Sequence, residues 1–207
     1  AVAYKWPAQQ AITTLQDIGI NVGRTGALNP YAVLEPVQVG GVTVKQATLH
    51  NEDYIATKDI RVGDQVVVQR AGEVIPQIVR VLPEGRTGDP PKFQMPTACP
   101  ACGGPVIRAP GESAHLCTNA SCSAQLFERL VHFRGAMDME GIGAQWVSTL
   151  LSPGLIHDVA DFYTLKQEDL VALERMGETL ATKLLANIQA SKQRPLGQLL
   201  YALGIPQ

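Results

Sequence analysis

Two pairs of cysteines in the middle of the chain constrain its fold more than any other feature. Two residues separate Cys99 from Cys102, fourteen residues follow, and four residues separate Cys117 from Cys122. Close pairs of thiols at this separation are typical of a tetrahedral zinc site with four thiolate ligands. Because four protein ligands leave no open coordination position, the sequence predicts a structural zinc rather than a catalytic one.

The segment around these cysteines has few large apolar side chains, so a metal would have to supply its folding energy, on the order of 10–16 kcal/mol by analogy with zinc-finger peptides. Gly103 and Gly104 would let the backbone turn around the metal. Two disulfides or four unrelated thiols are the alternatives, and the lack of a secretory signal disfavours disulfides. His115 could replace one ligand, although we expect it to be a solvated loop residue because four thiolates already fill the site.

The length and composition indicate a folded protein of one large domain or a few small ones. The chain has 207 residues, of which 45% are hydrophobic and 17% are charged, which permits packed cores and excludes wholesale disorder. No apolar stretch approaches the roughly 20 residues of a membrane helix. The formal net charge of −2 excludes a uniformly basic nucleic-acid coat. Because the chain begins with Ala1 and not Met, we expect it to be part of a longer protein.

The first 95 residues or so have the alternation of β-strands. We expect strands over 18–22, 32–39, 42–49, 66–68 and 74–82, with a short helix over 51–58 that Asn51 caps. Three strands, a helix and two strands is the element order of a five-stranded OB barrel, a common carrier of nucleic acid, although another small β-barrel would also fit. Residues 83–96 are rich in proline and glycine, which predicts a linker.

After residue 124 the pattern becomes helical. Apolar periodicity predicts helices over 125–133, 144–151, 165–173, 180–191 and 196–203. Gly141-Ile142-Gly143 separates two of them, Met176-Gly177 is a degenerate second copy, and Gly204 begins a third. This is the helix-hairpin-helix pattern, in which glycines let the turn approach a phosphate at a helix N-terminus. An ordinary helical bundle with glycine caps is the alternative.

The order of these modules, together with several short strings, resembles bacterial NAD-dependent DNA ligase over essentially the whole chain. The departures are small: Trp6 stands where the family usually has Phe, and Ser123 where it usually has Pro. The matching strings are Ala3-Tyr4-Lys5, Val22-Gly-Arg24-Thr-Gly26, Leu34-Glu-Pro36, Ala47-Thr-Leu-His50-Asn51, Gln69-Arg-Ala-Gly72, Val74-Ile-Pro-Gln77, His132-Phe133, Ala136-Met-Asp138 and Leu200-Tyr-Ala-Leu-Gly-Ile205.

The resemblance implies a multidomain α+β chain with four parts. Residues 1–7 would be the last strand of an adenylation domain and residues 8–92 an OB-fold domain. Residues 97–124 would form a small zinc finger with four cysteine ligands. Residues 125–207 would form an all-α helix-hairpin-helix domain, truncated at the end of the chain.

The resemblance also implies the DNA-binding portion of an enzyme that seals nicks between a 5′-phosphate and a 3′-hydroxyl during DNA replication and repair. The full-length enzyme would use NAD and Mg²⁺, and its partners would be nicked double-stranded DNA and its own adenylation domain. It would act in the bacterial cytoplasm, at the nucleoid, without a membrane. The family's nucleophilic lysine lies in a Lys-x-Asp-Gly motif that this chain lacks, so we expect the chain alone to be inactive.

Two other classes of protein remain open at this point. One is a free-standing nucleic-acid-binding or repair-scaffold protein built from the same modules. The other is an extracellular β–α protein with two disulfides.

Individual residues carry over from the resemblance. Lys5 matches a lysine that contacts the adenylate phosphate, which makes it the catalytic and cofactor-binding candidate. Arg24 and Arg70 match arginines that contact the DNA backbone, and Val74 and Ile75 match an apolar pair pressed into the minor groove. The remaining candidates are the hairpin glycines Gly141, Gly143 and Gly177 for DNA, and Cys99, Cys102, Cys117 and Cys122 for zinc.

Overall fold

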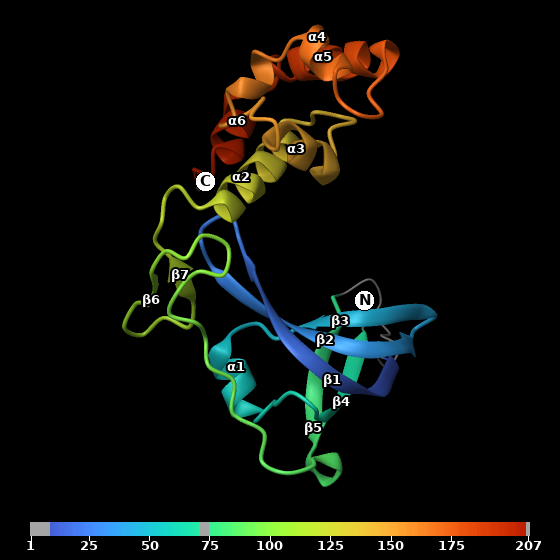
Figure 1. The fold of residues 1–207 in the computed structure, drawn as a ribbon, viewed down its shortest axis with the longest axis vertical. Coiled ribbons are helices and arrows are strands. Elements are labelled where there is room, and N and C mark those ends of the chain that lie inside the picture. Colours follow the sequence, from blue (N-terminus) through green and yellow to red (C-terminus); the bar gives the residue numbers. More distant parts are fainter. Residues whose placement is uncertain (1–8, 71–74, 206–207) are drawn as a thin grey trace, which may run out of the picture. The chain divides into compact units, whose positions relative to one another are not determined.

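The computed structural model describes residues 9–70 and 75–205, and it divides the chain into two compact units (Figure 1). The boundary between the units lies between Asn119 and Ala120. Each unit has its own cluster of buried apolar side chains. Within the described residues, no helix has the length and apolar character needed to cross a bilayer.

The first unit begins with five strands and one helix in the predicted order. The elements are β1 (Gln9–Val22), β2 (Leu28–Val39), β3 (Val42–Thr48), α1 (Glu52–Thr57), β4 (Gln65–Arg70) and β5 (Gln77–Leu82). The strands form one mixed sheet in the order β1-β2-β3-β5-β4, and the pairing of β1 with β4 closes it into a barrel. Only β3 and β5 run parallel, and the other described pairs are antiparallel.

The first strand is much longer than the sequence predicts, because it begins at Gln9 and not at residue 18. The missed half of the strand has a polar residue on its inner face. Thr13 is 7% exposed, and its hydroxyl donates to the carbonyl of Glu35 at 2.6 Å. Its neighbour Ile12 is 57% exposed. The apolar alternation that marks a half-buried strand is therefore inverted at this point.

Helix α1 begins where the sequence predicts a cap. The side chain of Asn51 accepts a hydrogen bond from the backbone N–H of Tyr54 at 2.9 Å, which satisfies one of the open donors at the helix N-terminus. Ile55 is the buried residue of the helix and joins the core of the barrel.

The predicted linker over 83–96 is wrong at its beginning and its end, because both pack onto the barrel. After a short 3-10 turn over Pro83–Gly85, Arg86 donates to both carboxylate oxygens of the fully buried Asp64, at 2.7 and 2.8 Å. Arg86 also donates to the carboxylate of Asp59 at 2.7 Å. At the far end Met95 is 8% exposed, and its N–H donates to the side chain of Glu52 at 2.6 Å. Ion pairs between distant residues leave no periodic signal in a sequence.

Two short strands complete the first unit. Strands β6 (Val106–Arg108) and β7 (His115–Cys117) pair antiparallel with each other. All of residues 98–119 are described, and Cys99 and Cys117 are the only buried side chains among them.

The second unit is helical over its described length. Its helices are α2 (Ser123–Ala136), α3 (Ala144–Leu151), α4 (Gln167–Val171), α5 (Glu178–Ser191) and α6 (Leu196–Ala202), with a 3-10 turn at Asp161–Tyr163 that the sequence analysis missed. The core stacks Phe133 on Phe162, with ring centroids 6.5 Å apart. The bounds of α3 agree with the predicted ones, and α2 and α5 each begin two residues earlier than predicted.

Candidate metal centre and nucleic-acid interface

The four cysteines come from three short segments. Cys99 and Cys102 lie in a tight turn before β6, Cys117 ends β7, and Cys122 is the N-cap residue of α2. The turn is closed by Gly103, whose φ of 69° favours glycine and whose N–H donates to the carbonyl of Cys99 at 2.8 Å. The glycines after the first pair therefore turn the backbone, as the sequence analysis expected.

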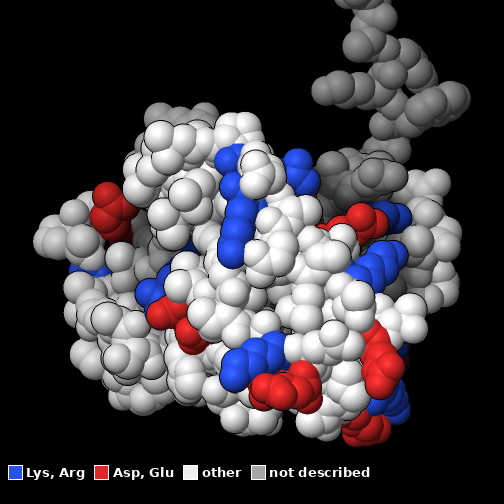
Figure 2. Space-filling view, turned by 90° about the horizontal axis from the view of Figure 1, so that it is seen from above, with Lys and Arg blue, Asp and Glu red and all other residues white. Residues whose placement is uncertain are grey.

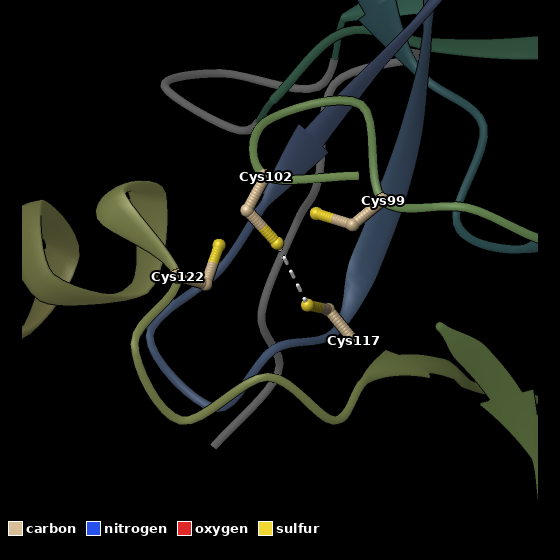
Figure 3. A group of neighbouring side chains, drawn as sticks. All are labelled: Cys99, Cys102, Cys117 and Cys122. Carbon is tan, nitrogen blue, oxygen red and sulfur yellow. Dashed lines mark hydrogen bonds between the residues drawn. The ribbon is translucent and has the colours of Figure 1, made fainter. Parts of the chain in front are cut away.

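The four sulfur atoms converge on one point (Figure 3). All four Sγ atoms lie within 4.8 Å of one another. The Sγ atoms of Cys102 and Cys117 are 3.6 Å apart, far beyond the roughly 2.05 Å of a disulfide bond. A tetrahedral zinc with four sulfurs at about 2.3 Å has edges of about 3.8 Å. The donor set and its spacing therefore fit a structural Zn²⁺.

The thiols of the cluster have different acidities. The N–H of Gly104 lies 3.4 Å from the Cys102 sulfur and is the main reason that the pKa of Cys102 is lowered to about 6. Burial raises the pKa of Cys117 to about 11. Several adjacent thiolates would repel one another without a cation, and a bound metal would favour the deprotonated form of all four.

The expectation that His115 is a solvated loop residue is wrong. It begins strand β7, its side chain is 13% exposed, and its Nε2 lies 3.4 Å from a carboxylate oxygen of Glu52 on α1. Its Nδ1 is buried without a hydrogen-bond partner among the described residues. The four-cysteine cluster does not include it. His115 thus lies where the finger contacts helix α1 of the barrel.

The predicted cation Arg24 lies in the turn between β1 and β2. Within this turn Gly26 donates to the carbonyl of Gly23 at 2.9 Å, and Gly23 donates to the carbonyl of Ala27 at 2.8 Å. Arg24 itself is half-buried, and its Nη1 is buried without a hydrogen-bond partner in the described part of the chain. One nitrogen of a permanent cation therefore lacks an acceptor.

Among the large apolar residues of the barrel that the structure describes, Ile75 is the most exposed, at 70%. The predicted strand over 74–82 begins only at Gln77, so Ile75 precedes it. The carbonyl of Pro76 accepts a hydrogen bond from the N–H of Thr48 at 2.8 Å, which fixes the backbone beside Ile75. Ile75 is therefore not a core residue of the barrel.

The first glycine turn of the helical unit has a simple backbone pattern. Gly141 has a φ of 87°, Ile142 is 1% exposed, and Gly143 is the extended N-cap residue of α3. A Cβ at Gly141 would lie 2.9 Å from Leu184 Cδ2, whereas a Cβ at Gly143 would meet nothing within 4 Å. The left-handed backbone and the close Leu184 thus favour a glycine at position 141, whereas position 143 has room for a side chain.

The second turn repeats this pattern with different residues. Arg175 has a φ of 64°, Met176 is 5% exposed, and Gly177 is the extended N-cap residue of α5. A Cβ at Gly177 would also meet nothing within 4 Å. Sequence reasoning noticed Met176-Gly177 but overlooked Arg175, which aligns with Gly141.

Charge is not concentrated on the face that Figure 2 shows. Basic side chains there are separated by uncharged surface and by acidic side chains. This distribution agrees with the small net charge of the chain.

Comparison with known protein families gives two matches, one over the barrel and one over the cysteine segment. Residues 12–90 match the NAD-dependent DNA ligase OB-fold domain, and residues 98–124 match the NAD-dependent DNA ligase C4 zinc finger domain. The chain carries the OB-fold and zinc finger domains of an NAD-dependent DNA ligase.

Relatives named DNA ligase match the chain over 99% of its length. That of Desulforamulus reducens is 56% identical over 207 residues, that of Halothermothrix orenii 55% over 208, and that of Halalkalibacterium halodurans 53% over 207. The chain spans 31% of the length of each of these ligases.

The ligase residues expected on the barrel are not all in one place. Arg24 follows β1, whereas Arg70 pairs with Gln9 at the beginning of β1. The two cations therefore lie near opposite ends of this 14-residue strand. Lys5 and Val74 lie outside the described residues.

Proposed function

We propose that the chain is the DNA-binding portion of an NAD-dependent DNA ligase and holds a nicked duplex while the rest of the enzyme carries out the chemistry. The observation that carries this proposal is the match of the OB-fold and C4 zinc finger domains, in this order, to that ligase family. The relatives named above are all DNA ligases, which favours this function over a free-standing repair scaffold.

The helical unit would add a helix-hairpin-helix domain over residues 125–207. The repeated pattern of a left-handed residue, a buried apolar residue and an N-cap glycine supports this proposal. The open space at Gly143 and Gly177 also supports it, because a side chain there would obstruct a phosphate without affecting the fold. Backbone N–H groups would bind phosphate here, so a net charge of −2 does not oppose DNA binding.

The barrel would contact the duplex through cations and an apolar wedge. The unsatisfied Nη1 of Arg24 and the 70% exposure of Ile75 support contacts to a phosphate and to the minor groove, respectively. We propose Arg70 as a second phosphate contact and Val74 as the partner of Ile75 in the wedge.

The zinc would be structural, and NAD and Mg²⁺ would belong to the chemistry of the whole enzyme. Lys5 would contact the adenylate phosphate as a point positive charge. The sequence has no Lys-x-Asp-Gly string, so we propose that the nucleophilic lysine lies outside this chain and that this chain forms no adduct with labelled NAD. The whole enzyme would act in replication and repair in the bacterial cytoplasm, at the nucleoid.

Fluorescence anisotropy with a nicked duplex, measured over a range of salt concentrations, tests this function. We expect sequence-independent binding with a salt slope shallower than that of proteins with 6–10 ionic phosphate contacts. Arg24→Ala should weaken binding on all sequences and reduce the slope by roughly one.

The glycine turn has a matched pair of variants. Gly143→Asp should weaken binding strongly, because its carboxylate would block and repel a phosphate. Gly197→Asp introduces the same charge at another position where a Cβ meets nothing within 4 Å, and it should bind like the wild type. If Gly143→Asp also binds like the wild type at every salt concentration, this turn only connects two helices and its assignment is wrong.

A further inference from the structure

We propose that the zinc finger positions the β1–β2 turn, so that metal binding at the four cysteines organises Arg24 for a DNA phosphate. The identity of the phosphate rests on the proposed function, but the coupling between metal and turn does not.

A short series of backbone hydrogen bonds connects the metal site to the turn. The N–H of Cys117 donates to the carbonyl of Gly26 at 2.9 Å, and Ala27 forms an isolated antiparallel bridge with Leu116. Gly26 in turn donates to Gly23 at 2.9 Å across the turn that contains Arg24. A proposed metal ligand is therefore a direct backbone partner of this turn, and Figure 3 shows β1 and β2 beside the cysteines.

The finger has little apart from metal to hold this strand in place. Strands β6 and β7 have three residues each, and residues 98–119, all described, bury no side chain other than Cys99 and Cys117. A two-stranded hairpin without a core is marginal in water. The position of Leu116 and Cys117 along Ala27 and Gly26 should therefore depend on the metal.

A second set of contacts docks the finger on α1. Arg108 of β6 donates to both carboxylate oxygens of Asp53, and Glu52 lies near both Arg108 and His115. The side chains of Arg108 and Asp53 are 35% and 52% exposed. Solvent screens an exposed pair of this kind, so these contacts orient the finger but do not replace the metal.

The position of the Arg24 guanidinium should follow the backbone of the turn. Its Nη1 has no hydrogen-bond partner among the described residues, so no hydrogen bond of this nitrogen would hold it if the turn relaxed. A cation that must meet a phosphate within hydrogen-bonding distance loses affinity when its backbone becomes mobile, because binding then includes the entropy cost of ordering it.

Amide hydrogen exchange by NMR, with the zinc-loaded chain and the chelator-treated chain, tests the coupling without DNA. We expect exchange at Gly23 and Gly26 to become at least tenfold faster when zinc is removed. The amides of Val66 and Val68, inside the barrel, are the control and should keep their protection. Unchanged rates at both glycines would overturn the proposal, and so would equal acceleration in β4.

A double comparison on a nicked duplex tests the consequence for Arg24. With zinc bound, Arg24→Ala should weaken binding roughly tenfold. In chelator-treated protein the same substitution should have almost no effect. Arg70→Ala, on β4 opposite the beginning of β1, should have the same effect with and without zinc. An equal effect of Arg24→Ala in both states would overturn the positioning role. No effect with zinc bound would remove Arg24 from the proposed DNA interface, and the exchange result would then decide the coupling alone.

Discussion

The barrel and the zinc finger are neighbours in the sequence, but different forces stabilise them. The barrel has strands of up to 14 residues, closes on itself and buries a contiguous apolar cluster that includes Leu15, Leu34 and Ile78. The finger has two strands of three residues, and only cysteines are buried among residues 98–119, all of which the structure describes. A metal can take the place of a core where the chain is too short to build one.

Removing zinc should have the largest effect, and it should affect the finger and the barrel differently. The finger should lose its structure, because it would lose a contribution on the order of 10–16 kcal/mol. The barrel should remain folded. An NMR spectrum with chelator should therefore lose the dispersed amide signals of residues 98–119 and keep those of β1–β5. Readdition of zinc is the control, and loss of both sets of signals would show that the barrel also depends on the metal.

Arg86→Ala should have the opposite effect to zinc removal, because it should destabilise the barrel and not the finger. Its partner Asp64 is fully buried, so the variant would leave a carboxylate without its counter-ion, at a cost of about 3 kcal/mol. Urea unfolding followed by circular dichroism measures this loss. The exposed Arg80 provides a control, because Arg80→Ala should change stability by less than about 0.5 kcal/mol. Equal losses for the two variants would contradict the role given to Asp64.

Arg108→Ala should have a much smaller effect than Arg86→Ala, although both arginines donate to both oxygens of a carboxylate. The Arg108–Asp53 pair is partly exposed and screened by solvent. The unfolding midpoint should move only slightly, and zinc content should stay at that of the wild type. A loss as large as that of Arg86→Ala would mean that docking on α1, and not the metal, stabilises the finger.

Acid should produce the smallest effect, through Asp59. Hydrogen bonds from Arg86 and then from Arg61 lower the pKa of Asp59 below its usual value of 3.8. Its stabilising contribution is therefore present above that value and lost as the pH falls through the lower folded value. The difference in urea midpoint between the wild type and Asp59→Asn should shrink between pH 5 and pH 3. A constant difference would contradict this ion pair.

The sequence predicted the elements whose signal is local. The element order of the barrel, the cap at Asn51 and helix α3 all follow from nearby residues. Prediction from the sequence failed where a contact between distant residues decides the structure. Thr13 can face the core because a backbone carbonyl of β2 accepts a hydrogen bond from its hydroxyl. Arg86 orders the segment that was predicted to be a linker, because it pairs with Asp59 and Asp64.

For the candidate site as well, local sequence signals were predictive and contacts between distant residues were not. The spacing of the cysteines was enough to predict the cluster that the structure brings together. The burial of His115 could not be predicted, because it depends on how β7 lies against α1. Arg175 could have been found from its alignment with Gly141, but its left-handed backbone is visible only in the structure.

Metal analysis of the freshly purified chain, combined with a thiol titration, tests the account most directly. We expect one zinc per chain, held by Cys99, Cys102, Cys117 and Cys122 at about 2.3 Å per sulfur. The four thiols should become reactive only when a chelator removes the metal. A chain that contains no zinc and has two disulfides would contradict the account.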